Sequence, residues 1–304
     1  MFHDYNLTKV STLYDLAKAN NASMICLTES HLYDRINDFE ISSDGWTILR
    51  SDRSNRLGGG VVNMIKSEFL INSKFSYSNS YCETLCVHIK LINLISVTIY
   101  RPPQCPADLF IEVIDKIEEW INQIENDGDR PILLINGDFN LPFMGIWDEE
   151  NVTSLMNLYT EKTENGRNIS SDKKQAMRLC EFSNSHFLHQ FIDTPTRMNN
   201  TLDLIFSNDD NLICDYENIV NMALSDHNTL VINTNIELSE TKVNEHKNIY
   251  YSKIPEFNLQ DVTEDEWNII NEKLYNINWD LKFEDKDPDE ITKILIEIIE
   301  NVIQ

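Results

Sequence analysis

The sequence contains 304 residues with a formal net charge of −25, and 41% of its side chains are hydrophobic. This composition is ordinary for a globular protein and excludes a disordered or fibrous chain. No apolar run approaches the roughly 18 residues that cross a bilayer, and the N-terminal text lacks the basic and apolar stretches of a signal peptide. We therefore expect an intracellular protein, nuclear or cytoplasmic, that is neither secreted nor bound to a membrane.

The acidic charge restricts the kinds of partner that the protein can hold by itself. Residues 237–304 carry 17 acidic and 7 basic side chains, a net charge of −10, and the remaining residues are acidic as well. A protein that grips nucleic acid through its phosphates normally carries a basic face. Tight, independent binding of DNA is therefore not expected, whereas a hydrolase whose nucleic acid is delivered by other means is compatible with this surface.

The six cysteines do not form a recognisable metal-binding set. Only Cys82 and Cys86 are close in sequence, and no second pair of Cys or His residues completes a zinc site. Several cysteines stand within apolar, strand-like text. We therefore expect reduced, buried thiols.

The first hundred residues predict one helix and five strands. Apolar residues at helical spacing indicate the helix, and the continuous apolar run SMICLT is typical of a buried strand. The last two strands are expected to form a hairpin that turns near Ile92 and Asn93. In chain order the predicted elements are the helix 8–20 and the strands 23–28, 45–52, 58–67, 83–91 and 93–100.

The next segments alternate helical and strand patterns. Isoleucines recur at helical spacing in LFIEVIDKIEEWINQI, whereas ILLINGD reads as a buried strand. A polar stretch predicts a long loop before a second amphipathic segment. The predicted order is a helix at 109–124, a strand at 132–138, a loop at 148–172, a helical segment around 177–187, and strands at 201–208, 211–220 and 228–236.

The character of the chain changes near residue 237. A charged linker is followed by two helical patterns, 264–277 and 290–303. We expect a domain at 1–236 and an acidic linker with a helical connector at 237–304. Because strands dominate and helices interleave, two sheets covered by helices fit the domain better than a purely parallel sheet.

Four segments place polar side chains directly after apolar, strand-like runs, where a rigid scaffold can present catalytic groups. Hydrolysis of a phosphodiester needs a cation to offset phosphate charge and a deprotonated water, and carboxylate and amide oxygens suit Mg²⁺. The segments are LTESH with Glu29, LLINGDFN with Asp138 and Asn140, TLDLIF with Asp203, and ALSDHNTLV with Asp226 and His227.

Each of these signals also has a plain structural interpretation. Glu29 can be a solvated carboxylate at a strand end, and the Gly-Asp-Phe-Asn sequence can be only a turn. Tyr100, before Arg101, is more often a packed aromatic residue than a phosphate contact. Asp203, flanked by Leu and Ile, needs a partner or an exposed edge, and His227 is the best candidate. The combination carries more weight than any single motif.

Taken in order, LTESHL, SDRSNRLGGGVV, VTIYRPP, LLINGDFNLP, DTPTRMNNTLDLIFSN and SDHNTLV resemble the endonuclease/exonuclease/phosphatase superfamily. More narrowly, they resemble the apurinic-site-type endonuclease domain of LINE-class (non-LTR) retrotransposons, over roughly residues 5–236. The resemblance implies an α/β fold, a four-layer sandwich of two mixed β-sheets flanked by helices, here with a helical C-terminal extension. It also implies one acidic site at an edge of the sheets.

The resemblance also implies a role for each matched residue. Glu29, Asp226 and Asn6, the counterpart of an asparagine on the family's first strand, would be metal ligands for Mg²⁺, with Mn²⁺ as an alternative. Asp138 and Asn140 would orient or activate the attacking water and contact the phosphate, and Tyr100 would lie near the scissile phosphate as a further catalytic and substrate-binding residue. His227 would contact a phosphate oxygen. Asp203 would orient that histidine by a hydrogen bond that favours its charged form.

The leading hypothesis is a magnesium-dependent endonuclease that hydrolyses DNA and leaves a 3′-hydroxyl to prime reverse transcription. Its expected partners are DNA and a reverse transcriptase domain beyond this chain. Two alternatives remain: a catalytically weak or decayed domain of retroelement origin, and a phosphodiesterase or phosphatase acting on a lipid or inositol phosphate.

Overall fold

A computed structural model describes residues 3–33, 35–53, 58–126, 128, 130–159, 170–220 and 225–236, together with 273, 274, 277, 279–283, 294 and 298. The chain divides into two compact units, Met1–Glu237 and Leu238–Gln304. In the second unit the described part contains the short helix α8 (Trp279–Phe283), while most of the predicted connector helices lie outside the described residues. No described helix has the length and apolar character needed to cross a membrane.

A six-stranded mixed sheet forms the centre of the first unit. The neighbours β6 and β7 run parallel, and the other described pairs in this sheet are antiparallel. Apolar residues make up most of β6 and β7, as expected for strands covered on both faces. The strand order is β4 (Ser73–Ser78), β5 (Glu83–Ile89), β6 (Leu94–Tyr100), β7 (Ile132–Asp138), β9 (Asp203–Ser207) and β8 (His189–Gln190).

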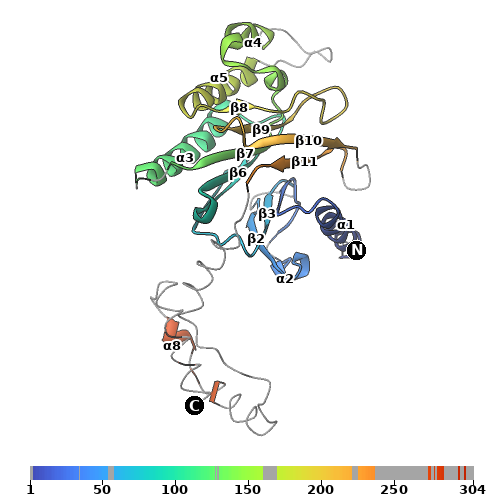
Figure 1. Cartoon of the computed structure of the whole chain (residues 1–304), viewed down its shortest axis with the longest axis vertical. Helices are drawn as coiled ribbons and strands as arrows, with labels where there is room; N and C mark the ends of the chain where they lie inside the picture. The colour runs from blue at the N-terminus through green and yellow to red at the C-terminus, as the bar shows by residue number, and fades with distance from the viewer. Residues whose placement is uncertain are drawn as a thin grey trace. The chain divides into compact units, whose positions relative to one another are not determined.

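One face of this sheet packs against helices (Figure 1). Helix α3 (Ala107–Asn126) buries a stripe of apolar residues at helical spacing. Each such side chain contributes about 1.5–3 kcal/mol on full burial. Beside α3 lie α4 (Val152–Leu158) and α5 (Ser170–Ser185), whose apolar residues join the same core. The predicted loop at 148–172 is therefore wrong over α4, where Leu155 and Met156 are buried on one helical face.

The opposite face of the six-stranded sheet packs against two smaller antiparallel sheets. The first has the order β1 (Met24–Thr28), β3 (Val61–Lys66) and β2 (Trp46–Ser51), and the second pairs β10 (Ile213–Ile219) with β11 (Thr229–Thr234). Helices α1 (His3–Ala19) and α2 (Asp38–Ile41) form the outer layer, where the ring of Tyr14 contacts that of Trp46 of β2. The α/β architecture of mixed sheet and flanking helices is confirmed.

Most sequence-predicted strands are confirmed to within a few residues, including the hairpin that turns at Asn93 in a left-handed conformation. The expected burial of the SMICLT strand is wrong: all of β1 is only partly buried, and so is most of β11. Each of these strands has one hydrogen-bonded neighbour within the described residues, β3 for β1 and β10 for β11. Their apolar side chains border a cavity instead of a further strand.

Candidate active site

Strand register aligns the candidate residues along one edge of the six-stranded sheet. Tyr100 lies opposite Asp138 in the parallel pair of β6 and β7, and Asp138 lies opposite Asp203 in the antiparallel pair of β7 and β9. Directly opposed residues project from the same face of a sheet. Tyr100 and Asp138 end their strands and Asp203 begins its own. The three side chains therefore form a row at one edge.

Asp138 is a buried carboxyl group with only 2% of its surface exposed. The backbone N–H of Asn140 donates to its Oδ1 at 3.0 Å, and Nδ2 of Asn140 donates to its Oδ2 at 2.6 Å. Burial, followed by the charge of Asp203, raises the pKa of Asp138 from 3.8 to about 7. This carboxyl group can thus gain or release a proton near neutral pH.

Gly137 lets β7 approach its neighbour closely at this position. Its φ is +142°, and an added Cβ atom would stand 1.9 Å from the carbonyl oxygen of Ile99 on β6. Gly137 and Asp138 belong to β7 rather than to a turn, so the alternative reading of the Gly-Asp-Phe-Asn text as only a turn is wrong. The left-handed residue of this segment is Asn140, with φ of +47°.

His227 forms a hydrogen-bonded pair with Asp203, with 2.8 Å between Nδ1 and Oδ2. Burial opposes the charged imidazole, but the hydrogen bond and charge of Asp203 outweigh it and raise the pKa of His227 above 6.5. Donor atoms of Asp138, Asp203 and His227 lie within 4.8 Å of one another. This spacing is compatible with a small cation as well as with a shared proton network.

Tyr100 connects this row to Glu29, which follows β1. The phenol O–H of Tyr100 donates to Oε1 of Glu29. Burial and the acceptance of this hydrogen bond by Glu29 raise the pKa of Tyr100, so the phenol stays protonated. Glu29 has a left-handed φ of +50°, its side chain is half-exposed, and its Oε2 lies 4.0 Å from Nε2 of His31. The Glu29 carboxylate thus contacts the row from the end of β1 in the three-stranded sheet.

Asp226 lies at the rim and does not belong to the group of three close donors. Its carboxylate pairs with Nη2 of Arg197 at 2.5 Å, and its side chain is 64% exposed. Although the little burial it has opposes ionisation, the Arg197 guanidinium lowers the pKa of Asp226. A cation at Asp226 would therefore compete with this arginine.

Asn6 is not where the sequence comparison puts it. Residue 6 lies in the first turns of helix α1, so its expected position on a strand is wrong. The sequence HDYNLTKV runs directly into the helical pattern that begins at Thr8, and no helix-breaking Gly or Pro lies between them. The side chain of Asn6 lies outside the described residues, so its role as a ligand stays a prediction.

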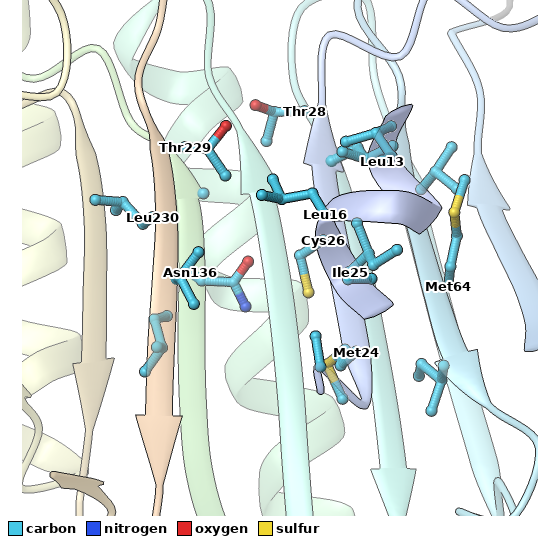
Figure 2. Close-up of a pocket in the computed structure, with 18 of the residues that line it drawn as sticks. Leu13, Leu16, Met24, Ile25, Cys26, Thr28, Met64, Asn136, Thr229 and Leu230 are labelled. Atoms are coloured by element: carbon cyan, nitrogen blue, oxygen red, sulfur yellow. The ribbon is translucent and has the colours of Figure 1, made fainter. Parts of the chain in front are cut away.

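A cavity opens between the two smaller sheets and reaches the candidate site. Leu13 and Leu16 of α1, Cys26 of β1 and Leu230 of β11 surround its apolar part, with Asn136 of β7 behind them (Figure 2). At its polar end the lining includes four candidate residues, Glu29, Asp203, Asp226 and His227. These four residues therefore share one cavity.

Arg101 supports the site from within the core, and its role was not foreseen from the sequence. Its guanidinium is fully buried, donates to the carbonyl oxygens of Phe139 and Asn140 at 3.1 and 3.0 Å, and forms an ion pair with Asp172 of α5. Nδ2 of Asn140 in turn donates to the carbonyl of Arg101. The only sequence signal was a charge immediately after the apolar strand β6.

A second buried ion pair lies behind Tyr100. Arg53 bonds the carboxylate of Glu83, the neighbour of Tyr100 on β5, and its guanidinium lies 5.4 Å from the centre of the Tyr100 ring. Neither Arg53 nor Glu83 was singled out in the sequence, because their positions on adjacent segments reveal no pairing. The pair therefore contacts the ring of the tyrosine whose hydroxyl binds Glu29.

Comparison with known proteins agrees with this geometry. The family model described as endonuclease-reverse transcriptase matches residues 94–231, which include Tyr100, Asp138, Asn140, Asp203, Asp226 and His227. The fold is similar to that of the 3′–5′ exonuclease NExo from Neisseria meningitidis, with a TM-score of 0.54 and 11% identity over 76% of this chain and 96% of the other. The match over residues 94–231 and the similar fold confirm the resemblance to the endonuclease/exonuclease/phosphatase superfamily that the sequence motifs indicated.

Other solved structures of the superfamily are similar as well. The AP endonuclease LMAP from Leishmania major has a TM-score of 0.51 and 11% identity over 76% of this chain and 84% of its own. The endonuclease domain of TRAS1, a telomere-specific non-LTR retrotransposon, has a TM-score of 0.49 and 15% identity over 77% of this chain and 94% of its own. No curated protein matches the sequence. The superfamily consists of hydrolytic nucleases and phosphatases, most of which depend on a divalent metal.

The donor set fits a hard divalent cation. Carboxylate oxygens of Asp138 and Asp203 lie in the close donor group, Glu29 and Asp203 line the same cavity, and such oxygens are the ligands that Mg²⁺ and Mn²⁺ prefer. Asp203 accepts a hydrogen bond from His227 and Glu29 accepts one from Tyr100, whereas both oxygens of Asp138 accept hydrogen bonds from Asn140.

Proposed function

We propose that this protein is a divalent-metal-dependent phosphodiesterase that cleaves DNA as an endonuclease and leaves a 3′-hydroxyl end. The observation that carries the proposal is the convergence of Asp138, Asp203 and His227 within 4.8 Å at the edge of the sheet. Phosphodiester hydrolysis requires a general base with a pKa near neutral, a charged group against the phosphate, and carboxylates that can hold a cation. Asp138, His227 and Asp203 supply groups of these kinds.

Glu29 would hold the cation together with a carboxylate of the row, and Asp226 would join it on release from Arg197. When bound, such a cation offsets the negative charge of the phosphate and favours loss of a proton from water. Tyr100 keeps the Glu29 carboxylate oriented by donating its O–H. Arg197, which competes with the cation for Asp226, is partly exposed. It places a positive charge next to the site, whereas the surface as a whole is acidic.

Asp138 would accept the proton of the attacking water. Its pKa of about 7 places this carboxyl group near the pH at which a general base is most effective. Asn140 binds both carboxylate oxygens and thereby fixes the direction in which Asp138 can accept a proton. Arg101 donates hydrogen bonds to the carbonyl oxygens of Phe139 and Asn140 and so keeps Asn140 in place.

His227 would donate a hydrogen bond to a phosphate oxygen. Its Nδ1 is bonded to Asp203, which leaves Nε2 for the substrate and favours the charged imidazolium near neutral pH. An imidazolium placed against a phosphate stabilises the additional charge that develops as water attacks. Asp203 and His227 therefore act as one unit, with Asp203 as the orienting member.

Supercoiled plasmid tests the proposal directly. With Mg²⁺ the protein should convert plasmid to nicked circles that DNA ligase reseals, which requires a 3′-hydroxyl end. His227→Gln should lower the nicking rate by at least 100-fold, since positioned acid–base groups contribute about 10²–10⁴-fold. His189→Gln is the matched control, because His189 pairs with Asp210 at the opposite end of β9.

The proposal fails if wild type and His227→Gln nick plasmid equally, or if neither nicks it and the wild type instead releases phosphate from an inositol phosphate. A protein that binds neither Mg²⁺ nor Mn²⁺ in calorimetry while keeping its fold would identify a decayed domain. A fusion to a reverse transcriptase domain belongs in the same assay, because the acidic surface disfavours unaided capture of DNA.

A further inference from the structure

Two buried thiols meet at the end of the strand pair that carries Tyr100. Cys82 immediately precedes β5, and Cys105 lies in the loop between β6 and α3. Because Glu83 lies opposite Tyr100 in the antiparallel register, the chain enters β5 and leaves β6 at the same end of the sheet. The two Sγ atoms are 3.1 Å apart, and the residues are 0% and 3% exposed.

Backbone contacts hold both cysteines in place. The N–H of Cys82 donates to Oδ1 of Asn79 at 2.9 Å. The carbonyl of Cys105 accepts a hydrogen bond from Nε2 of Gln175 at 2.9 Å, and its N–H donates to the carbonyl of Pro102 at 3.1 Å. The sulfur atoms thus lie in two anchored turns. A disulfide bond of about 2.05 Å requires them to approach by only about 1 Å.

The other cysteines have no comparable neighbour. All six lie within the described residues, and no second pair of sulfur atoms among them shares a hydrogen bond. Cys86, which is close to Cys82 in sequence, is fully buried and its thiol faces Thr84 at 3.9 Å. The pairing partner of Cys82 in space is therefore Cys105, and Cys86 provides a matched buried control.

We propose that Cys82 and Cys105 form an intramolecular disulfide when the folded protein meets a small peroxide. The Cys105 thiolate attacks one peroxide oxygen, the O–O bond breaks, and the departing oxygen takes up a proton as water, leaving a sulfenic acid. The Cys82 thiolate then attacks the Cys105 sulfur, the S–O bond breaks, and the second oxygen leaves as water. Two thiols lose two hydrogens and hydrogen peroxide is reduced to two waters.

The electrostatics favour Cys105 as the attacking thiol. The hydrogen bond from Cys82 lowers the pKa of Cys105, against burial, and the charge of Arg101 acts in the same direction. The same contact raises the pKa of Cys82, so Cys105 is the member of the pair that loses its proton more readily. Hydrogen peroxide is small enough to reach a buried sulfur through a local opening, whereas a bulky disulfide reagent needs a larger one.

The bond would tie the entrance of β5 to the loop that follows Arg101. It closes a loop of 23 residues in sequence, which restricts the unfolded chain and stabilises the folded one. For a unit of this size the melting temperature should rise by roughly 6 °C. This inference concerns a covalent modification site and does not depend on the proposed nuclease activity.

Peptide mapping of the full chain tests it. The reduced protein is exposed to hydrogen peroxide in native buffer, then denatured, alkylated and digested for mass spectrometry. We expect one peptide pair joined through Cys82 and Cys105, four alkylated cysteines, and a rise in melting temperature that dithiothreitol reverses. Cys105→Ser should abolish the cross-link and the rise, whereas Cys86→Ser should keep both.

Six alkylated cysteines after oxidation, or cross-links distributed among other pairs, would overturn the proposal. Oxidation in urea provides the reference, since an unfolded chain should give mixed pairings. The map of the wild-type protein requires no variant, so the proposal stays testable even if Cys105→Ser folds poorly.

Discussion

Replacing Asp138 by Asn removes one ionisable group from the row at the sheet edge and should change how stability depends on pH. In the folded protein, burial and the neighbouring Asp203 raise the pKa of Asp138 from 3.8 to about 7. Between these values the folded state keeps a proton that the unfolded chain has released. The free energy of unfolding therefore carries this contribution in full below pH 3.8 and loses it as pH rises through 7.

The magnitude follows from the size of the shift. A difference of 7 − 3.8 = 3.2 pKa units corresponds to about 4 kcal/mol at 1.36 kcal/mol per unit, of which about 3 kcal/mol falls between pH 5 and pH 8. His227, whose pKa is also raised, adds a loss of the same sign. Asn at position 138 keeps one oxygen to accept from Asn140, so the turn beyond β7 should survive.

Urea unfolding at pH 5 and pH 8, with a chelator present, measures the effect. The free energy of unfolding of the wild-type protein should fall by about 3 kcal/mol more than that of Asp138→Asn between pH 5 and pH 8. Asp210→Asn, which removes an exposed carboxylate that pairs with His189, serves as the control and should follow the wild type. If the free energies of unfolding of wild type and Asp138→Asn change with pH in parallel to within 0.5 kcal/mol or so, burial does not raise the pKa of Asp138 and the reasoning fails.

Three further predictions concern the support of the site. Asp203→Asn should lower the pKa of His227, because the carboxylate partner raises it, and an NMR titration of the imidazole would detect this shift; an unchanged pKa would contradict the pairing. Arg101→Met should destabilise the fold by about 3–5 kcal/mol in urea unfolding, because it breaks the buried ion pair with Asp172, and a loss below 1 kcal/mol or so would refute that account. Gly137→Ala should cost at least about 3 kcal/mol, because its Cβ atom meets the carbonyl of the adjacent strand; a melting temperature equal to the wild type would show that the strands can separate there.

The sequence predicted the strands and their polar ends well because both signals are local. Apolar runs gave β6 and β7, and the polar side chains at their ends indicated the edge where Tyr100 and Asp138 lie. The pairing of Asp203 with His227 was also expected, since a carboxylate between Leu and Ile needs a partner. The superfamily resemblance supplied the order of these motifs, which periodicity alone does not contain.

The remaining contacts join residues far apart in the chain, and no local pattern encodes them. Arg101 and Asp172 are 71 residues apart and meet only because α5 packs beside the end of β6. Arg197 pairs with Asp226 across 29 residues, and Cys82 finds Cys105 across a strand hairpin rather than its sequence neighbour Cys86. Helix α4 was missed because it is short and only two of its side chains are buried, so no apolar pattern at helical spacing is visible in its sequence.

The alignment of Tyr100, Asp138 and Asp203 on three adjacent strands affects when the site can be lost. Their spacing is set by the register of three adjacent strands, so the row should persist until these strands separate. Heat should then disrupt the row itself only at the unfolding transition. His227 and Glu29 lie next to strands of other sheets, so detachment of His227 from Asp203, or of Glu29 from Tyr100, could inactivate a protein that is otherwise still folded.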